Sequence, residues 1–272
     1  ECTLPALDVE QEVKHLMQAL HQPQHNGLLH VTLMPGRSGL SDELRAEAEA
    51  AGYAICDEAT DLTNILDLLN QQPYHIMHFL GHGRFNQRDD SAMLIMENRN
   101  GNAKLYKDHE IAEALKAVKT QPSLIFIAAC ESARRDAEEG NAFVGLAPHL
   151  IQAGIPAVIA MQDVVPITGT QTLSREFYQY LLQHGIVDLA LNQARLQLYD
   201  RQSRDWAIPA LFTRLKRGEL FTKDPVRTAL DTMTQHDMFN PLPANEPYLP
   251  VEVLHLSGKV EAVDLKNLSR EQ

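Results

Sequence analysis

The chain lacks the features that mark membrane, disulfide-rich and nucleic-acid-binding proteins. No run approaches the about 18 consecutive apolar residues of a membrane-spanning helix. Cysteine occurs three times in 272 residues, an odd number with no CxxC pair. This pattern excludes a disulfide framework and argues against a zinc site built on thiolates. Basic residues are outnumbered 24 to 36, and the net charge of −12 argues against sequence-independent binding to nucleic acid.

Residues 1–25 lack a charged segment followed by an apolar core, so the sequence predicts no signal peptide there. The first residue is Glu1 instead of Met, from which we expect a fragment of a longer protein. The few cysteines indicate a reducing compartment, so the sequence favours a cytoplasmic location without membrane contact. Hydrophobic residues make up 44% and charged residues 22%, which is typical of a folded globular domain.

Short apolar runs alternate with amphipathic segments from the start of the chain to about residue 223. The pattern predicts strands at 28–34, 53–57, 74–80, 123–129 and 156–161, hairpins at 92–106 and 210–222, and helices at 8–21, 41–51, 61–70, 108–118, 141–153, 170–183 and 187–199. The single strands between helices are apolar on both faces. They predict an α/β fold with a mostly parallel central sheet and helices on both faces.

Residues 1–223 form one predicted domain, and residues 224–272 differ from it in composition. Four prolines fall within Asn240–Pro250, which is typical of a linker, while Val251–Val263 has the composition of one or two strands. We expect this tail to add little to the core, to be nicked first by proteases within Asn240–Pro250, and to lead to a further domain. A tail docked on the domain would instead be an autoinhibitory or assembly element.

Three predicted strands end in residues that can carry chemistry: His82, Cys130 and Asp163. Ligands bind at the carboxyl ends of the strands in open parallel sheets, so neighbouring strands would bring an imidazole, a thiol and a carboxylate together. A thiol becomes a strong nucleophile when a nearby histidine takes its proton. The backbone N–H groups of Gly83 and Cys130 are candidates for stabilising an oxyanion.

Two motifs resemble those of the CHAT family of caspase-like proteins. His78–Gly83 (HFLGHG) resembles the strand and histidine motif, and Ile127–Ser132 (IAACES) resembles the strand and cysteine motif. The histidine precedes the cysteine by 48 residues, near the spacing of about 50 in caspases. The resemblance covers about residues 3–223. Further similar segments are Leu4–Glu10, Phe143–Pro148, Gly154–Gln162, Trp206–Phe212 and Gly218–Phe221.

The resemblance implies a caspase-like three-layer sandwich that cleaves peptide bonds in protein substrates. It assigns His82 as general base, Cys130 as nucleophile and Gly83 as an oxyanion donor, and it requires no metal or organic cofactor. It also implies control by a sensor domain or activating partner in prokaryotic antiviral defence or signalling. Two alternatives stay open: a catalytically silent scaffold that binds a partner, and a small-molecule hydrolase that uses the same thiol.

Two further residues are candidates for substrate binding. Asp163 can line a pocket for a basic substrate side chain, orient His82, or cap the following loop. The negative net charge favours the first of these roles, so we expect arginine or lysine before the cleaved bond. Arg84 follows the histidine motif and is suited to attracting an acidic residue or a backbone carboxyl group.

The remaining histidines and cysteines of interest have structural interpretations. His75 and His78 lie three residues apart in one strand and therefore point to opposite faces, which argues against a shared metal site with His82. A lone buried cysteine usually behaves as a small hydrophobic residue, and we interpret Cys2 and Cys56 in this way.

Overall fold

The computed structural model describes residues 9–25, 27, 29–37, 39–86, 91–129, 142–162, 167–200, 204–221 and 251–257. Its helices are α1 (Val9–His25), α2 (Asp42–Ala50), α3 (Leu62–Gln71), α4 (Asp108–Lys116), α5 (Ala142–Gln152), α6 (Ile167–His184), α7 (Val187–Asp200) and the 3-10 helix η2 (Arg204–Ala207). Its strands are β1 (Leu29–Met34), β2 (Ala54–Ile55), β3 (Ile76–Asn86), β4 (Ser91–Glu97), β5 (Ala103–Lys107), β6 (Leu124–Ala129), β7 (Ala157–Met161), β8 (Pro209–Thr213) and β9 (Val251–Ser257).

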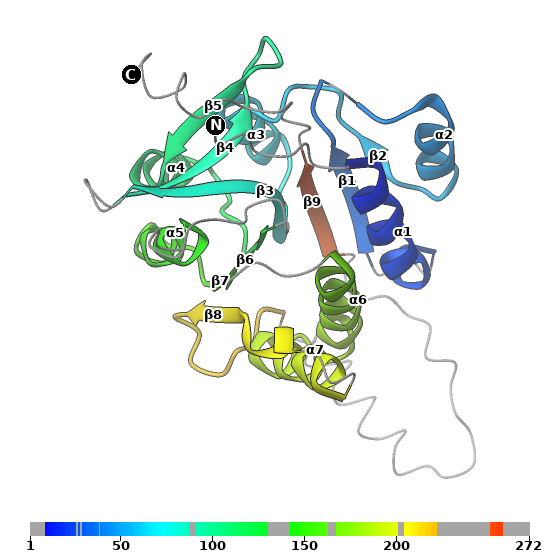
Figure 1. Ribbon diagram of the computed structural model, residues 1–272, viewed down its shortest axis with the longest axis vertical. Coiled ribbons are helices and arrows are strands. Elements are labelled where there is room, and N and C mark those ends of the chain that lie inside the picture. The colour runs from blue at the N-terminus through cyan, green and yellow to red at the C-terminus, as the bar shows by residue number, and fades with distance from the viewer. Residues whose placement is uncertain are drawn as a thin grey trace.

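The strands form one mixed sheet in the order β2-β1-β9-β3-β6-β7-β8 (Figure 1). Neighbours from β2 to β7 are parallel, and β8 closes the far side antiparallel to β7. The hairpin of β4 and β5 branches from the second half of β3. This topology confirms the predicted α/β class, and it makes neighbours of β3, β6 and β7, the strands whose ends carry the candidate site residues.

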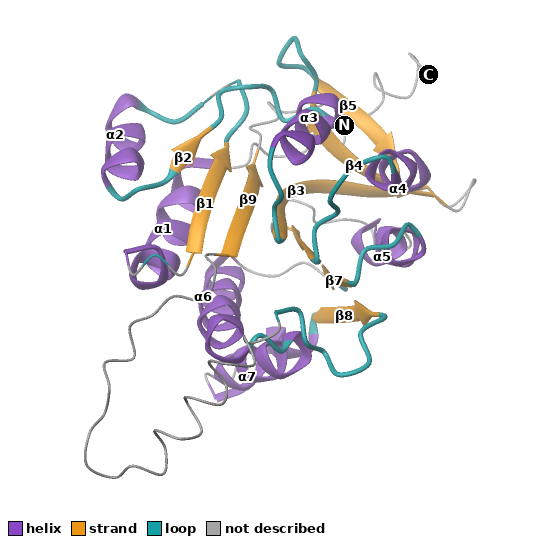
Figure 2. Ribbon diagram, turned by 180° about the vertical axis from the view of Figure 1, so that it is seen from behind, coloured by secondary structure: helices purple, strands orange, loops and turns teal. Residues whose placement is uncertain are grey.

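Helices cover both faces of the sheet, as Figures 1 and 2 show from opposite sides. Side chains of β3 alternate between the two faces. His78 and Leu80 meet residues of α1 and α6 on one face. Met77 and Phe79 meet residues of α3, α4 and α5 on the other face. The apolar runs read from the sequence are therefore buried on both sides, as a covered parallel sheet requires.

Local capping explains where two of the helices begin. The Oγ of Ser41 accepts the N–H of Leu44 at 3.4 Å, and the carboxylate of Asp61 accepts the N–H of Asn64 at 2.7 Å. Both caps confirm the predicted starts of α2 and α3. The helix predicted at 108–118 is α4, and Asp108 is its first residue. Its buried carboxylate accepts the N–H of a β4 residue, Ala92, at 3.0 Å.

Strand β9, the last of the described strands in the sequence, lies at the centre of the sheet between β1 and β3 (Figure 1). It forms six registered pairs with β1 and five with β3. The expectation that the tail adds little to the core is therefore wrong for Val251–Ser257, where four apolar side chains are at most 5% exposed. Residues 222–250 and 258–272 lie outside the described part of the chain, so the predicted domain boundary at 223 stays a prediction.

The described residues that flank 222–250 meet at His75, just before β3. The rings of Phe221 and His75 pack edge to face with centroids 5.9 Å apart. His75 donates its N–H to the carbonyl of Glu252 at 2.9 Å, and its Nδ1 accepts the N–H of Glu252 at 3.0 Å. Phe221 and Glu252, on either side of this long segment, therefore both contact His75.

The two halves of the predicted hairpin at 210–222 do not pair with each other, so this prediction is wrong. Its first strand, β8, pairs with β7 and covers the apolar edge of the sheet. Its second part turns away instead, and Glu219 forms an isolated bridge with Ile186 at the start of α7. Gly218 makes this turn with a positive φ of 69°, and its carbonyl accepts the N–H of Val187 at 2.8 Å.

Candidate active site

His82 lies where β3 changes partners at the carboxyl edge of the sheet. Up to Gly81, which is opposite Ala129, β3 is parallel to β6. From His82 onward, β3 is antiparallel to β4. Alternation along the strand places His82 on the same face as His78 and Leu80, the face covered by α1 and α6. The side chain of His82 is only 2% exposed.

The other predicted site residues are only partly within the described structure. Gly83 is buried and lies opposite Leu94 of β4. The backbone of Arg84 belongs to β3, but its side chain lies outside the described residues, as do Cys130 and Asp163. The structure thus places His82 and Gly83 at the expected edge, while the roles of all five residues remain predictions.

The aromatic ring of Phe79 packs against Gly81, the residue immediately before His82. A Cβ atom at Gly81 would lie 2.5 Å from Cζ of Phe79 and 2.8 Å from its Cε1. Both distances are far inside normal contact. Phe79 is 5% exposed and belongs to the apolar layer beneath α3, α4 and α5, so its ring cannot move without disturbing the core. The glycine of this motif is therefore required by close packing within β3.

We expect Gly81→Ala to lower both thermal stability and catalytic activity. Overpacking of this kind costs about 1–3 kcal/mol, and the displaced backbone directly precedes His82. Thermal unfolding and peptide cleavage measure the two effects. The double variant Gly81→Ala/Phe79→Leu removes the opposing ring and should recover part of both losses. A single variant as stable as the parent would contradict the packing argument.

A buried carboxylate joins two loops at this edge to the β4–β5 hairpin. Glu97, the last residue of β4, is 2% exposed. It accepts the N–H of Arg37 at 2.7 Å and the N–H of Thr60 at 3.4 Å. Arg37 follows β1 and Thr60 precedes α3, so one side chain fixes the loops beside the candidate site. Sequence reasoning missed Glu97, because no local feature identifies the distant backbone groups whose N–H bonds it accepts.

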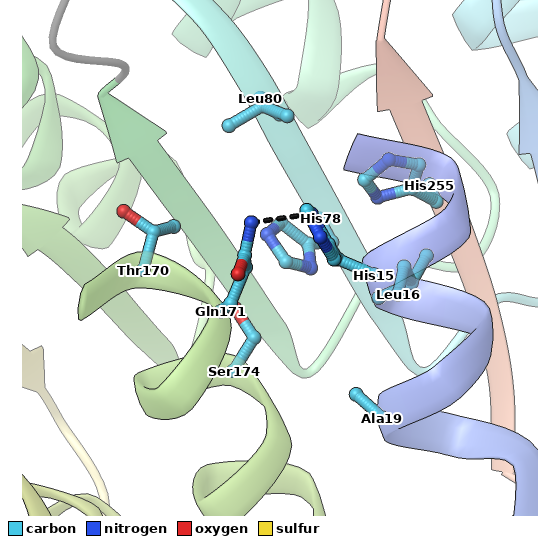
Figure 3. Close-up of a pocket in the computed structure, with 9 residues that line it drawn as sticks. All are labelled: His15, Leu16, Ala19, His78, Leu80, Thr170, Gln171, Ser174 and His255. Carbon is cyan, nitrogen blue, oxygen red and sulfur yellow. Dashed lines mark hydrogen bonds between the residues drawn. The ribbon is translucent and has the colours of Figure 1, made fainter. Parts of the chain in front are cut away.

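A group of mostly polar residues lines a cavity between the sheet and helices α1 and α6 (Figure 3). The cavity is small, about 20 Å3, which is room for roughly one water molecule. Its lining consists of His15, Leu16 and Ala19 of α1, His78 and Leu80 of β3, Thr170, Gln171 and Ser174 of α6, and His255 of β9. The Gln171 amide is hydrogen-bonded to the His15 ring. The lining contains no aspartate, glutamate, lysine or arginine, so its described polar groups are all uncharged or imidazoles.

Burial keeps the two central histidines of this cavity neutral. Burial lowers the pKa of His78 well below its usual value, and the nearby ring of His255 lowers it further. Burial lowers the pKa of His255 to about 4. The ring centroids are 5.0 Å apart, and Nδ1 of His78 is 3.1 Å from the hydroxyl of Tyr178. This hydrogen bond supports the structural interpretation of His78 drawn from the sequence.

We expect the free energy of unfolding to fall as the pH is lowered from about 6.5 to about 4. In this window the unfolded histidines bind protons that folded His78 and His255 do not, so acid favours the unfolded state. His255 alone accounts for on the order of 3 kcal/mol at the acid end. Urea unfolding between pH 4 and pH 8 measures this loss.

The matched variants are His255→Gln and, as a control, His21→Gln on the exposed side of α1. The first should flatten the acid slope, because it removes one group that titrates differently in the two states. The second should leave the slope unchanged. An unchanged slope in His255→Gln would show that this buried imidazole does not cause the loss.

Comparison with known proteins assigns the chain to one family. The CHAT domain family matches residues 3–248, which is most of the chain. No curated protein matches the chain. Within the described ranges, no three His, Cys, Asp or Glu side chains are grouped so as to hold a metal ion. Nor is any helix in those ranges both long and apolar enough to cross a bilayer.

Proposed function

The chain belongs to the CHAT domain family, a caspase-like protease module, and on this basis we propose that it is a cysteine endopeptidase in which His82 activates Cys130. The observation that carries the proposal is the register of β3 against β6. Gly81 is directly opposite Ala129. The next residues along these two parallel strands are His82 and Cys130.

The register supports a dyad because neighbouring strands lie only about 4.8 Å apart. Along β6, Phe126 points to the α1 and α6 face, where its ring packs against His78 at 4.6 Å between centroids. Continued alternation would direct the side chain of Cys130 to that face, on which His82 also lies. A thiol and an imidazole on adjacent strands, at one level and on one face, are within reach of proton transfer.

In the proposed reaction, His82 takes the thiol proton of Cys130, and the resulting thiolate attacks the carbonyl carbon of the scissile peptide bond. The N–H groups of Gly83 and Cys130 stabilise the oxyanion. The protonated His82 then gives its proton to the leaving amine as the carbon–nitrogen bond breaks. Water hydrolyses the thioester that remains on Cys130 and releases the second product.

Regulation is part of the proposal, and the burial of His82 supports it. At 2% exposure, the ring is covered in the described conformation, so a substrate reaches it only after the surrounding chain rearranges. We propose that a sensor domain or activating partner triggers this rearrangement, in prokaryotic antiviral defence or signalling in the cytoplasm. Arg84 and Asp163 remain proposed substrate contacts near the dyad.

Alkylation of the three cysteines by iodoacetamide at neutral pH tests the nucleophile. We expect Cys130 to react on the order of tenfold faster than Cys56, because only the thiolate reacts and His82 favours it. Cys56 provides the internal comparison, since burial raises the pKa of its half-buried thiol. Mass spectrometry of tryptic peptides gives the rate at each cysteine.

The labelling results separate the proposal from its alternatives. The His82→Gln variant should slow alkylation of Cys130 while leaving the rate at Cys56 unchanged. Equal rates at Cys130 and Cys56 in the parent protein would contradict the activated dyad and favour a silent scaffold. Cleavage of a peptide library by the labelling-competent protein then distinguishes an endopeptidase from a small-molecule thiol hydrolase.

A further inference from the structure

The large apolar side chains that the described residues expose to solvent are concentrated on α7 and η2. They are Leu189, Leu196 and Tyr199 of α7 and Trp206 of η2, with exposed fractions between 42% and 60%. The rings of Tyr199 and Trp206, the aromatic pair, pack edge to face with centroids 5.9 Å apart. Exposed aromatic rings that cluster in this way are typical of binding surfaces.

The aromatic pair lies at the carboxyl edge of the sheet, beside the end of β7. The N–H of Gln162, just after β7, donates to the carbonyl of Ile208 at 2.9 Å, and Trp206 is two residues before Ile208. Arg195 of α7 donates to the carbonyl of Pro209, the first residue of β8. Figures 1 and 2 both show α7 next to β8. The C-terminal half of α7 is therefore held at the edge where the candidate site lies.

The strand register places the start of β8 two strands away from the proposed nucleophile. Ile127 of β6 is opposite Ala160 of β7, so Ala129, two residues further, is level with Gln162. Cys130 is the next residue after Ala129. Because neighbouring strands lie about 4.8 Å apart, the backbone that leads from η2 into β8 is about 10 Å from this level of β6.

The chemistry of the proposed dyad determines the direction in which a substrate crosses this edge. His82 gives its proton to the leaving amine, so the chain after the cleaved bond lies on the β3 side of Cys130. The chain before the cleaved bond extends to the opposite side, across the end of β7 toward η2. An extended chain advances about 3.3 Å per residue, so about 10 Å corresponds to three residues. The fourth residue before the cleaved bond therefore comes level with the aromatic pair.

We propose that Tyr199 and Trp206 form a subsite for an apolar side chain at the fourth residue before the cleaved bond. The inference rests on the proposed peptidase activity of His82 and Cys130. Contact with leucine or phenylalanine removes apolar surface of the substrate and of both rings from water. A carboxylate is disfavoured there, because the face of an aromatic ring carries partial negative charge.

Peptides that differ only at the fourth residue before the cleaved bond test the subsite. With leucine, lysine and aspartate at that position, we expect the parent protein to cleave the leucine peptide fastest. Its kcat/KM should exceed that of the aspartate peptide at least about tenfold. Fastest cleavage of the lysine or aspartate peptide would overturn the proposal.

Variants of the aromatic pair separate a subsite from a structural role. Trp206→Ala and Tyr199→Ala should each lose most of the preference through slower cleavage of the leucine peptide, while the aspartate peptide is cleaved as before. A structural defect would slow both peptides equally. The control is Leu189→Ala, which truncates an exposed side chain of α7 about 15 Å from Tyr199 and should keep the preference. An unchanged preference in both aromatic variants would also overturn the proposal.

A second measurement does not depend on catalysis. Trp206 is the only tryptophan of the chain, so intrinsic tryptophan fluorescence reports directly on the subsite. In Cys130→Ala protein, addition of the uncleaved leucine peptide should shift the emission to shorter wavelength, because the indole moves from water into apolar contact. The aspartate peptide should leave the emission unchanged.

The two measurements distinguish failure of the subsite from failure of the proposed function. If the emission shifts but the parent protein cleaves no peptide, the subsite stands and the peptidase assignment fails. If the parent protein cleaves these peptides and the emission does not shift, the peptidase assignment stands and the subsite is wrong. Absence of the shift overturns the subsite whether or not the parent protein is active.

Discussion

Cys130→Ala is expected to abolish peptide cleavage while leaving the fold intact. The proposed acyl-enzyme forms on the sulfur of Cys130, and a methyl group cannot replace that sulfur as a nucleophile. Loss of a catalytic nucleophile lowers kcat by a factor on the order of 10^4 or more. Cleavage of a susceptible peptide measures the loss, and circular dichroism with thermal unfolding checks that the fold persists.

Cys56→Ala is the matched control for this experiment. Cys56 is half-buried beside the end of β2, and its N–H donates to the carbonyl of Leu33 at 2.8 Å, a backbone bond that alanine keeps. We expect this variant to retain full activity. Full activity in Cys130→Ala, or inactivation by Cys56→Ala, would show that the nucleophile has been assigned to the wrong residue.

His82→Ala is expected to reduce cleavage nearly as severely as Cys130→Ala. The two residues act on one proton, so removal of either member removes most of the benefit of the pair. The double variant should therefore be about as slow as either single variant, a strong departure from additivity. Independent contributions that multiply in the double variant would contradict a dyad.

The buried position of His82 requires a structural control. His82 is 2% exposed at the β3–β4 junction, so truncation to alanine also leaves a cavity. His82→Gln fills more of that space and keeps a polar side chain, but it cannot serve as a base near neutral pH. Equal inactivation by the glutamine and alanine variants, with stability restored only in the former, would separate the chemical role of His82 from packing.

Much of the fold could be predicted because local pattern and sheet position agree for most strands. The runs at 74–80, 123–129 and 156–161 are apolar on both faces, and they became the adjacent strands β3, β6 and β7. Their order along the chain matches their order in the sheet from β3 onward, apart from the β4–β5 hairpin. A strand followed by a helix and a parallel neighbour is the connection that sequence patterns indicate best.

The position of β9 could not be predicted, because no local feature of Val251–Ser257 identifies its partners. The prolines of Asn240–Pro250 indicated a linker and led to the expectation of a peripheral tail. The ladder that holds β9 is with β1 and β3, more than 170 residues earlier in the chain. Pairing over such separations depends on which slot in the sheet is open, and that is a property of the whole fold.

In the candidate site, too, local features could be predicted from the sequence and contacts between distant segments could not. His82 was identified because its motif and its place after an apolar strand are local features. The cavity with His15 and His255 was not, since it joins α1, α6 and β9 from opposite ends of the chain. The carboxylate of Glu97 was missed for a similar reason, because its partners are backbone groups of Arg37 and Thr60 in other loops.

The central place of the last strand has a consequence for how the protein is made. During synthesis, β1 and β3 leave the ribosome long before β9. Neither strand can pair with β9 until Ser257 has been synthesised. The nascent chain therefore carries two partial sheets, each with an open apolar edge, and such edges are prone to pair with other chains. Completion of the sheet is therefore a late event in folding, in which the centre closes after the flanks, and a chaperone that shields β1 and β3 would act in that interval.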